Sequence, residues 1–461
     1  MQSHLTKVGK LRKPSHWLTS ANSLVMLVLA VSGTTYPVKA ADLLATYHAA
    51  QSQDAVFAAA QAAHRAGLEK LPQGVSLLLP SVNLSANNTF NDSANQYSGA
   101  NAGFYTSNTV RFDTLSYGVN LTQPLFHLPN WVIYTEAGLQ VAQADAQLMA
   151  AEQDLVVRVA QAYFNVLIAQ NSVQLAEAQK IAITEQLEQA KRNFEVGTAT
   201  ITDTLEAQAS YDLVSSQKIA AQSDMEIKKR TLQQLTNAMP DNLRQLGQQF
   251  KLEELPTGVE KWVDEAQLHN PQLAVAQISA ELAEKEVVRN RGGHYPTLDL
   301  IASYSENYAS GGLTGVSSGG RNTSVGVQLN MPLYQGGATQ SKVREAEANR
   351  DRAKDDLENT RRTITLQVHQ AYLGVVNGIA QVKALQQALK SSESLLDASK
   401  LGQEVGVRTN LDVLNAQKQL FSTRRDLYQA EYSYLTSQLQ LKAAVGTLSE
   451  NDLAMVNQAL Y

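Results

Sequence analysis

Apolar residues recur along two long stretches of the chain at steps of three, four and seven. They include Leu155, Val159, Tyr163, Val166 and Val173 in the first stretch, and Ile364, Val368, Tyr372, Val375 and Val382 in the second. Such steps place side chains on one face of an α-helix. Residues 130–239 and 333–461 also lack proline, which costs about 3 kcal/mol inside a helix. The pattern therefore predicts very long helices in both windows.

Four shorter stretches alternate apolar with small polar residues, which predicts β-strands. Their apolar positions are Val82, Leu84 and Ala86; Leu115, Tyr117, Val119 and Leu121; Leu298, Leu300, Ala302 and Tyr304; and Val325, Val327, Leu329 and Met331. Residues 87–110 and 305–323 are rich in Gly, Ser and Asn and predict exposed loops. The polar face meets either bulk water, as in a soluble antiparallel sheet, or a wet lumen. Four strands are too few to close a barrel alone.

The chain is an internal duplication. Shifted by 209 residues, Glu195–Gln208 aligns with Glu404–Gln417, and eight of the fourteen positions are identical. The two copies share the pattern Gly-x-x-Thr-x-x-Asp, as Gly197, Thr200 and Asp203 and as Gly406, Thr409 and Asp412. Each repeat thus reads as two strands followed by a hairpin of long helices.

The shared pattern is that of a helix–turn–helix junction. Glycine suits the left-handed residue after a helix, threonine is a good N-cap, and an acid three residues later lies at the positive end of the next helix. Arg408 replaces Ala199 of the first turn. A cation in only one of two duplicated turns is a candidate to pair with Asp203 of the other, and in a ring of copies such pairs hold a gate shut.

The first forty residues carry five cations, no acid and an apolar run from Leu24 to Val31. This is typical of a secretory signal peptide cleaved after Ala40, and the run is too short for a spanning helix, which needs about 20 residues. Of 461 residues none is cysteine, and the net charge is −5. Disulfides and thiolate metal sites are excluded, and an acidic exported chain is a poor nucleic-acid binder.

No catalytic or cofactor-binding pattern stands out. The histidines after the leader show no spacing typical of a metal site and are interpreted as surface or interface residues. Gly336 and Gly337 lack the lysine of a P-loop and the spacing of a dinucleotide fingerprint, so they predict a tight strand-to-helix junction. We expect no enzyme activity, no metal and no cofactor.

Several motifs make the chain resemble the TolC family of bacterial outer-membrane export ducts. They are Leu121–Phe126 (LTQPLF), Ala162–Leu167 (AYFNVL), Tyr334–Gly337 (YQGG), Ala444–Leu448 (AVGTL) and both glycine turns. The resemblance implies an α+β membrane protein in the cell outer membrane: a homotrimer whose 12-stranded β-barrel, four strands from each subunit, continues into a long periplasmic α-helical barrel with a mixed equatorial domain.

On this resemblance the chain divides into five parts. These are a signal peptide (1–40), a first repeat of a helix, two strands and a long helical hairpin (41–239), an equatorial linker (240–270), a second such repeat (271–448) and a C-terminal equatorial segment (449–461).

The resemblance also assigns roles to residues of the two turns. Asp412 matches an acidic ring at the periplasmic entrance that is associated with cation passage and block, and the second ring position falls on Asn415, which weakens the expectation of strong cation selectivity. Gly197 and Gly406 match tip glycines that contact the adaptor.

The family's closing network falls on Arg408, Thr202 and Asp203, and Gln403 replaces its aromatic gate partner.

The function so implied is a passive exit duct for drugs, proteins or both. Its expected partners are two further copies of itself, a periplasmic adaptor (membrane fusion) protein, an inner-membrane transporter of RND or ABC type, and outer-membrane lipid, with no nucleic acid. A periplasmic coiled-coil scaffold without a pore is the alternative. It accounts for the helices but not for four alternating strands.

Overall fold

The computed structural model describes residues 42–95, 108–240, 242–247, 252, 255, 258–312 and 316–460. The predicted signal peptide lies outside these residues. The helices are α1 (Leu43–Gln53), α2 (Ala55–Leu68), α3 (Lys70–Ser76), α4 (Leu128–Glu195), α5 (Ile201–Thr236), α6 (Val259–His269), α7 (Pro271–Arg291), the 3₁₀ turn η2 (Gly292–His294), α8 (Ala338–Glu404), α9 (Asn410–Val445) and α10 (Glu450–Gln458). The strands are β1 (Ser81–Asn95), β2 (Asn108–Phe126), β3 (Thr297–Ala309) and β4 (Ser318–Asn330).

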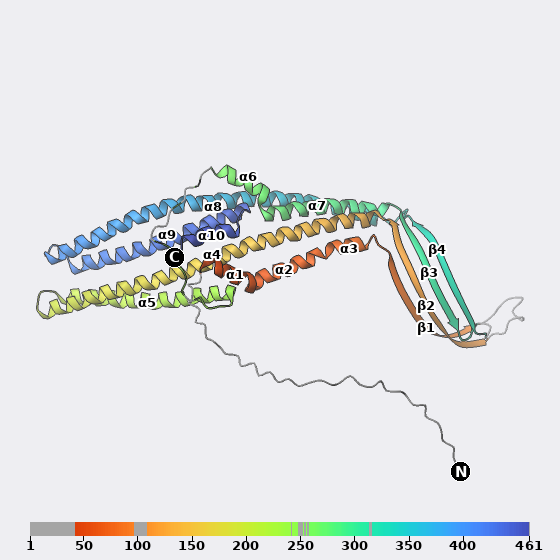
Figure 1. Cartoon of the computed structure of the whole chain (residues 1–461), viewed down its shortest axis with the longest axis horizontal. Helices are drawn as coiled ribbons and strands as arrows, with labels where there is room; N and C mark the ends of the chain where they lie inside the picture. The colour runs from red at the N-terminus through yellow and green to blue at the C-terminus, as the bar shows by residue number, and fades with distance from the viewer. Residues whose placement is uncertain are drawn as a thin grey trace, which may run out of the picture. The chain divides into compact units, whose positions relative to one another are not determined.

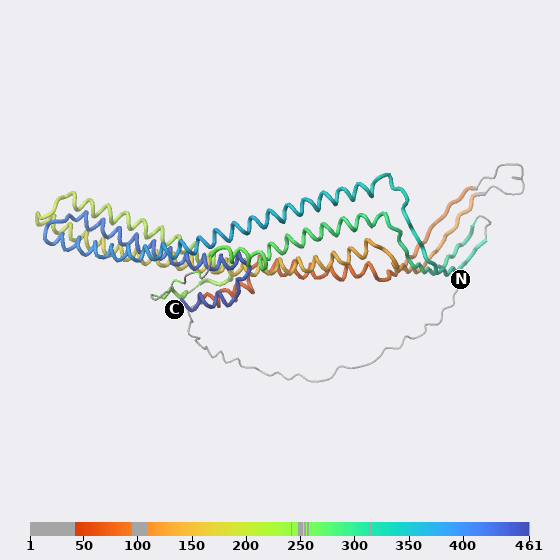
Figure 2. Tube along the Cα trace, turned by 90° about the horizontal axis from the view of Figure 1, so that it is seen from above, coloured from red at the N-terminus to blue at the C-terminus, as the bar shows by residue number. Residues whose placement is uncertain are grey.

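The two long helices occupy the proline-free windows. Helix α4 has 68 residues and α8 has 67, and each is about 100 Å long at about 1.5 Å per residue. Each folds back through a short turn onto a helix of 36 residues, α5 or α9. Both turns lie at the end of the helices that is remote from the sheet (Figure 1). Toward the sheet α7 packs between α4 and α8 (Figure 2).

The main hydrophobic core lies midway along the long helices. Buried side chains of α4, α8 and α9, among them Tyr163, Phe164, Val368 and Tyr432, pack there against α1 and α10. The linker and the C-terminal segment also meet at this level, where Leu246 forms a bridge with Leu460 and the amide of Gly247 bonds the carbonyl of Ala459 at 3.0 Å. The limits of the two repeats and of the equatorial segments stay a prediction.

The four strands form one antiparallel sheet in the order β1-β2-β3-β4. The prediction of loops at 87–110 and 305–323 is wrong for much of both ranges, because β1 runs to Asn95, β2 begins at Asn108, β3 runs to Ala309 and β4 begins at Ser318. Asn, Ser and Gly disfavour strands by propensity alone, but continuous pairing with a neighbouring strand satisfies their backbone groups.

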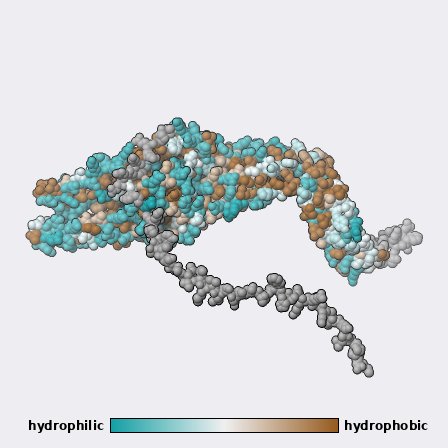
Figure 3. Space-filling model, viewed as in Figure 1, coloured by the Kyte–Doolittle hydropathy of each residue, from teal (hydrophilic) through white to brown (hydrophobic). Residues whose placement is uncertain are grey.

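The two faces of the sheet differ in polarity. One carries the alternating apolar set, such as Leu84, Val119, Leu300 and Val327, and these side chains are exposed or half-buried in the single chain. The other carries mostly Asn, Ser, Thr and Gly. Figure 3 shows apolar residues gathered over the part of the sheet nearest the helices and hydrophilic ones over its far end. Among the described residues, no helix is both long and apolar enough to cross a membrane.

Candidate functional site at the helix tips

A glycine in the left-handed region follows the C-cap residue of each long helix. Gly197 has φ 76° and Gly406 has φ 78°, and a Cβ at either position would meet nothing within 4 Å. The positive φ therefore accounts for the glycine at each position, because there is space for a larger side chain. In each turn the two amides after the glycine bond one carbonyl of the last helical turn, that of Asn193 at 2.8 and 3.1 Å or that of Gly402 at 2.8 and 3.1 Å.

A reciprocal capping box starts each returning helix, as the sequence predicts. In the first tip the amide of Asp203 donates to Thr200 Oγ1 at 3.2 Å, while Asp203 Oδ2 accepts from the amide and hydroxyl of Thr200 at 2.8 and 2.7 Å. Thr409 and Asp412 repeat this arrangement with distances of 3.2, 2.9 and 2.9 Å. Each acid thus satisfies the orphan donors of its own helix start.

The capping bonds also favour the ionised acids. The Thr200 hydroxyl and then its amide lower the pKa of Asp203 below its usual value. The amide of Thr409 and then its hydroxyl lower the pKa of Asp412, with a smaller contribution from Arg408. Hydrogen bonds to a carboxylate stabilise its charged form, so both tips carry a negative charge at neutral pH.

Arg408 lies over its own turn. Its Nη1 is 3.8 Å from Asp412 Oδ1, and the two side chains are 55% and 38% exposed. A Cβ on Gly402 would lie 2.6 Å from Arg408 Cγ, so this glycine makes room for the arginine stem. Within one chain the arginine thus contacts the acid of its own tip, and its pairing with Asp203 stays a prediction.

The other residues singled out from the sequence surround the same turns. Gln403 Nε2 donates to Asn410 Oδ1 at 3.4 Å across the second tip. Asn410 was not singled out, because nothing in its sequence position indicates that the turn brings it back to α8. Thr202 is exposed on the first turn of α5, and Asn415 is exposed on the second turn of α9.

The two hairpins pack against each other just behind the tips. Leu414 of α9 is buried against Ile183 of α4 and Val214 of α5, so the tips lie side by side (Figure 2). Apolar side chains are exposed next to each glycine, with Val196 73% and Val407 75% accessible. Large exposed apolar side chains at a helix end mark a surface that another chain can cover.

Three histidines lie closer to acids than their spacing in the sequence suggests. His64 Nε2 is 2.6 Å from Asp145, His127 Nε2 is 3.0 Å from Asp299, and His48 Nε2 is 3.4 Å from Glu450. Each pair joins segments far apart along the chain. No group of three potential metal ligands exists among the described residues.

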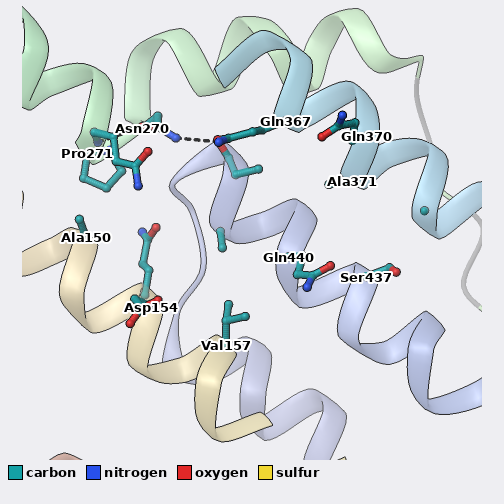
Figure 4. Close-up of a pocket in the computed structure, with 15 residues that line it drawn as sticks. Ala150, Asp154, Val157, Asn270, Pro271, Gln367, Gln370, Ala371, Ser437 and Gln440 are labelled. Carbon is teal, nitrogen blue, oxygen red and sulfur yellow. Dashed lines mark hydrogen bonds between the residues drawn. The ribbon is translucent and has the colours of Figure 1, made fainter. Parts of the chain in front are cut away.

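A cavity of about 420 Å³ lies between α4, α7, α8 and α9 (Figure 4). Gln367, Gln370 and Gln440 line it, and Asn270 donates to the carbonyl of Ala444 at its rim at 2.8 Å. Its one acidic lining residue, Asp154, lies 2.6 Å from Arg158. An amide-lined cavity with a single paired acid offers no acid and base for catalysis.

Comparison with known proteins identifies the family. The model of the family described as outer membrane efflux protein matches residues 46–238 and 262–447, and the chain belongs to this family. It is 34% identical to outer membrane protein TolC of Vibrio cholerae over 450 residues, covering 95% of this chain and 98% of that protein. It is 33% identical to the alkaline protease secretion protein AprF of Pseudomonas aeruginosa, covering 90% of this chain and 86% of that protein.

The fold agrees with that of a solved outer membrane protein. The outer membrane protein VceC of Vibrio cholerae has a TM-score of 0.74 at 20% identity, covering 88% of this chain and 96% of that one. The protein is therefore an outer-membrane exit channel of the TolC type with a periplasmic extension, and not an enzyme. Channels of this type are trimers that work with adaptor proteins and inner-membrane transporters. Family membership favours the channel over a scaffold without a pore.

Proposed function

We propose that the channel is a passive conduit that opens at the α4–α5 and α8–α9 tips when a periplasmic adaptor docks there. The adaptor links it to an inner-membrane transporter of RND or ABC type, and the cargo is drugs, secreted proteins or both. The relatives point to both cargo classes, since one is named as a protease secretion protein and the family as efflux proteins. A wide duct need not discriminate between them.

Gly197 and Gly406 are the proposed adaptor contacts. The observation that carries this proposal is that both turns are exposed at the end remote from the sheet and lack a side chain at their apex. The open space around each glycine allows a partner backbone to approach closely. Exposed Val196 and Val407 supply apolar surface beside them.

Arg408, Asp203, Thr202 and Gln403 are the proposed gate network. Arg408 is more than half exposed and reaches Asp412 only at 3.8 Å, a weak contact that leaves it able to turn toward a neighbouring tip. A surface ion pair contributes only about 0 to 1 kcal/mol. Three copies acting together hold the closed state, and adaptor docking overcomes them.

Asp412 and Asn415 are the proposed residues of the periplasmic entrance. They lie three positions apart at the start of α9, and so on neighbouring positions of one helix face. The charge of Asp412 is favoured by its capping bonds. In a trimer this arrangement makes one ring of three acids, with a neutral amide ring beside it.

Crosslinking from the tip tests the proposal. The chain has no cysteine, so Val407→Cys carries the only reactive thiol. Val316→Cys is a matched control because that valine is 65% exposed and lies just before β4, at the end of the sheet that is remote from the helices. In cells, we expect the tip thiol to capture the adaptor and, through it, the transporter, whose class then separates drug efflux from protein secretion. Equal capture at both ends, or none at the tip, contradicts tip docking.

A further inference from the structure

One row of residues crosses the apolar face of the sheet where its first charged residues lie. The strand register aligns Ala86, Tyr117, Glu306 and Arg321 from β1 to β4. Toward the helices the same face carries Val, Leu and Ala, such as Leu300. Beyond the row the same face is mixed, because it carries Arg111 and Asp113 as well as exposed Phe90 and Leu115. The row holds the first charged residues of this face, counted from the helices, and is therefore the boundary of its uninterrupted apolar band.

A buried carboxylate lies at the centre of this row. Tyr308 donates to Glu306 Oε2 at 2.9 Å, Tyr117 donates to the same oxygen, and Tyr304 donates to Oε1. Arg321 Nε lies 3.1 Å from Oε1, and the side chains of Arg321 and Glu306 are 75% and 10% exposed. Three tyrosine hydroxyls thus satisfy the carboxylate of Glu306, so this carboxylate does not need a hydrogen bond from Arg321.

The position of the row matches the outer surface of the membrane. Phe126 lies nine positions after Tyr117 on β2, a length of about 30 Å along a strand. With a barrel tilt of about 40° this spans about 23 Å, close to the apolar band of outer-membrane barrels. Exposed aromatics mark the helix-side boundary, including Phe126, Trp131, Tyr295 and Tyr334. Since the helices are periplasmic, the Glu306 row lies among the outer-leaflet headgroups.

We propose that Arg321, held by Glu306, binds a phosphate of an outer-leaflet glycolipid. The contact to Glu306 uses Nε, so the terminal amino groups of this exposed guanidinium are accessible to a second oxyanion. Guanidinium binds phosphate through two parallel hydrogen bonds. The tyrosine rings, with Tyr117 and Tyr308 stacked at a centroid distance of 6.3 Å, form an amphipathic platform beside the acyl chains. The inference rests on the outer-membrane position and not on the gate or the partner pump.

Arg111 on the same face is a less suitable ligand. It is 71% exposed, but it pairs at 3.0 Å with Asp92, whose side chain is 46% exposed. No tyrosine among the described residues donates to this acid. Arg111 lies six positions before Tyr117, about 20 Å further out along β2. It is therefore a matched control of similar exposure on the same face.

The test measures lipid retention by the full-length trimer. Wild type, Arg321→Gln and Arg111→Gln are purified and exchanged into nanodiscs of phosphatidylcholine doped with either diphosphoryl lipid A or its enzymatically dephosphorylated form. Native mass spectrometry after release from the nanodisc counts the glycolipid that remains bound. Circular dichroism and the trimer mass confirm that each variant is assembled.

We expect wild type to retain the diphosphoryl form about tenfold better than the dephosphorylated form, because removal of the phosphate removes a charge-assisted bidentate contact. Arg321→Gln should lose this preference, and Arg111→Gln should keep it. Equal retention of both glycolipids by wild type overturns the proposal without reference to any variant. An unchanged preference in Arg321→Gln, or an equal loss in Arg111→Gln, overturns it as well.

Discussion

The tip of α4–α5 and the tip of α8–α9 are built on the same backbone but carry different side chains. Both have a left-handed glycine, two amides on one carbonyl and a Thr–Asp capping box. The first has Asn193 and Ala199 where the second has Gly402 and Arg408. The glycine and the arginine belong together, because the arginine stem lies over Gly402. The two repeats thus share the turn, while only the second carries a cation at this position.

The difference gives the two tips different expected roles. Among the described residues, Asp203 of the first tip bonds only its capping threonine, whereas Asp412 of the second tip also faces Arg408. If Arg408 turns toward the Asp203 of a neighbouring tip, it leaves its own contact with Asp412. Opening of the gate and cation binding at the entrance are then coupled, because Arg408, which takes part in the gate, also screens the charge of Asp412.

The largest expected effect concerns the entrance acid. Asp412→Asn should weaken block by multivalent cations added on the periplasmic side by roughly tenfold or more, because three like charges around one axis are removed together. Planar-bilayer recordings of block against cation concentration measure this. Asp203→Asn makes the same chemical change in the first tip and is expected to alter block much less. Unchanged block in Asp412→Asn means that this acid does not line the entrance.

The next effect concerns the gate. Arg408→Ser should raise single-channel conductance in planar bilayers roughly two- to tenfold, since three surface pairs of at most about 1 kcal/mol each are lost together. Arg424→Ser, at a half-buried arginine of α9 paired with Glu393 at 2.8 Å, is the control and should leave conductance unchanged. Wild-type conductance in Arg408→Ser rules out the lock.

The third effect concerns the capping boxes, which the two tips share. Thr200→Ala and Thr409→Ala are each expected to destabilise their tip by about 1 kcal/mol, the usual cost of a lost N-cap. Hydrogen exchange of peptides from the two tips, followed by mass spectrometry, measures the local opening free energy. If the substitution lowers the local opening free energy at one tip but not at the other, the two turns are not equivalent.

A smaller effect separates the arginine from the glycine beneath it. Gly402→Asn gives the second tip the residue of the first and displaces the flexible Arg408 stem while keeping its charge. We expect a rise in conductance of about twofold, below that of Arg408→Ser, because the cation remains near the tip. Asn193→Gly is the reciprocal control in the first tip. A rise equal to that of Arg408→Ser indicates that position, rather than charge, closes the gate.

The smallest effect is that of pH. The folded-state pKa values of Asp203 and Asp412 are lowered from 3.8, so their capping bonds stabilise the tips fully above that pH and lose their contribution as pH falls through the lowered values. Nitroxide labels at Thr198→Cys and Val407→Cys should show unchanged mobility from pH 7 to pH 5 and rising mobility only below pH 3.8. A transition at pH 6 excludes the two acids as its cause.

Local chemistry made the tips predictable from the sequence. Gly197, Thr200 and Asp203 act on backbone groups within a few residues, so their roles follow from spacing alone. The long helices followed from proline-free windows with a helical period. The strands were recognised by alternation near the helices, but their outer halves were not, because Asn and Ser become strand residues only when a partner strand pairs with them.

Only the tertiary structure decided which distant groups meet. The contacts of Gln403 with Asn410, of His127 with Asp299 and of Glu306 with Tyr117 depend on turns and strand register that spacing does not encode. Sequence by itself determined the periodic elements, their caps and the family resemblance, since these depend on neighbours along the chain. The acid that marks the edge of the apolar band required the sheet, because its three hydroxyl donors lie on two strands joined only by folding.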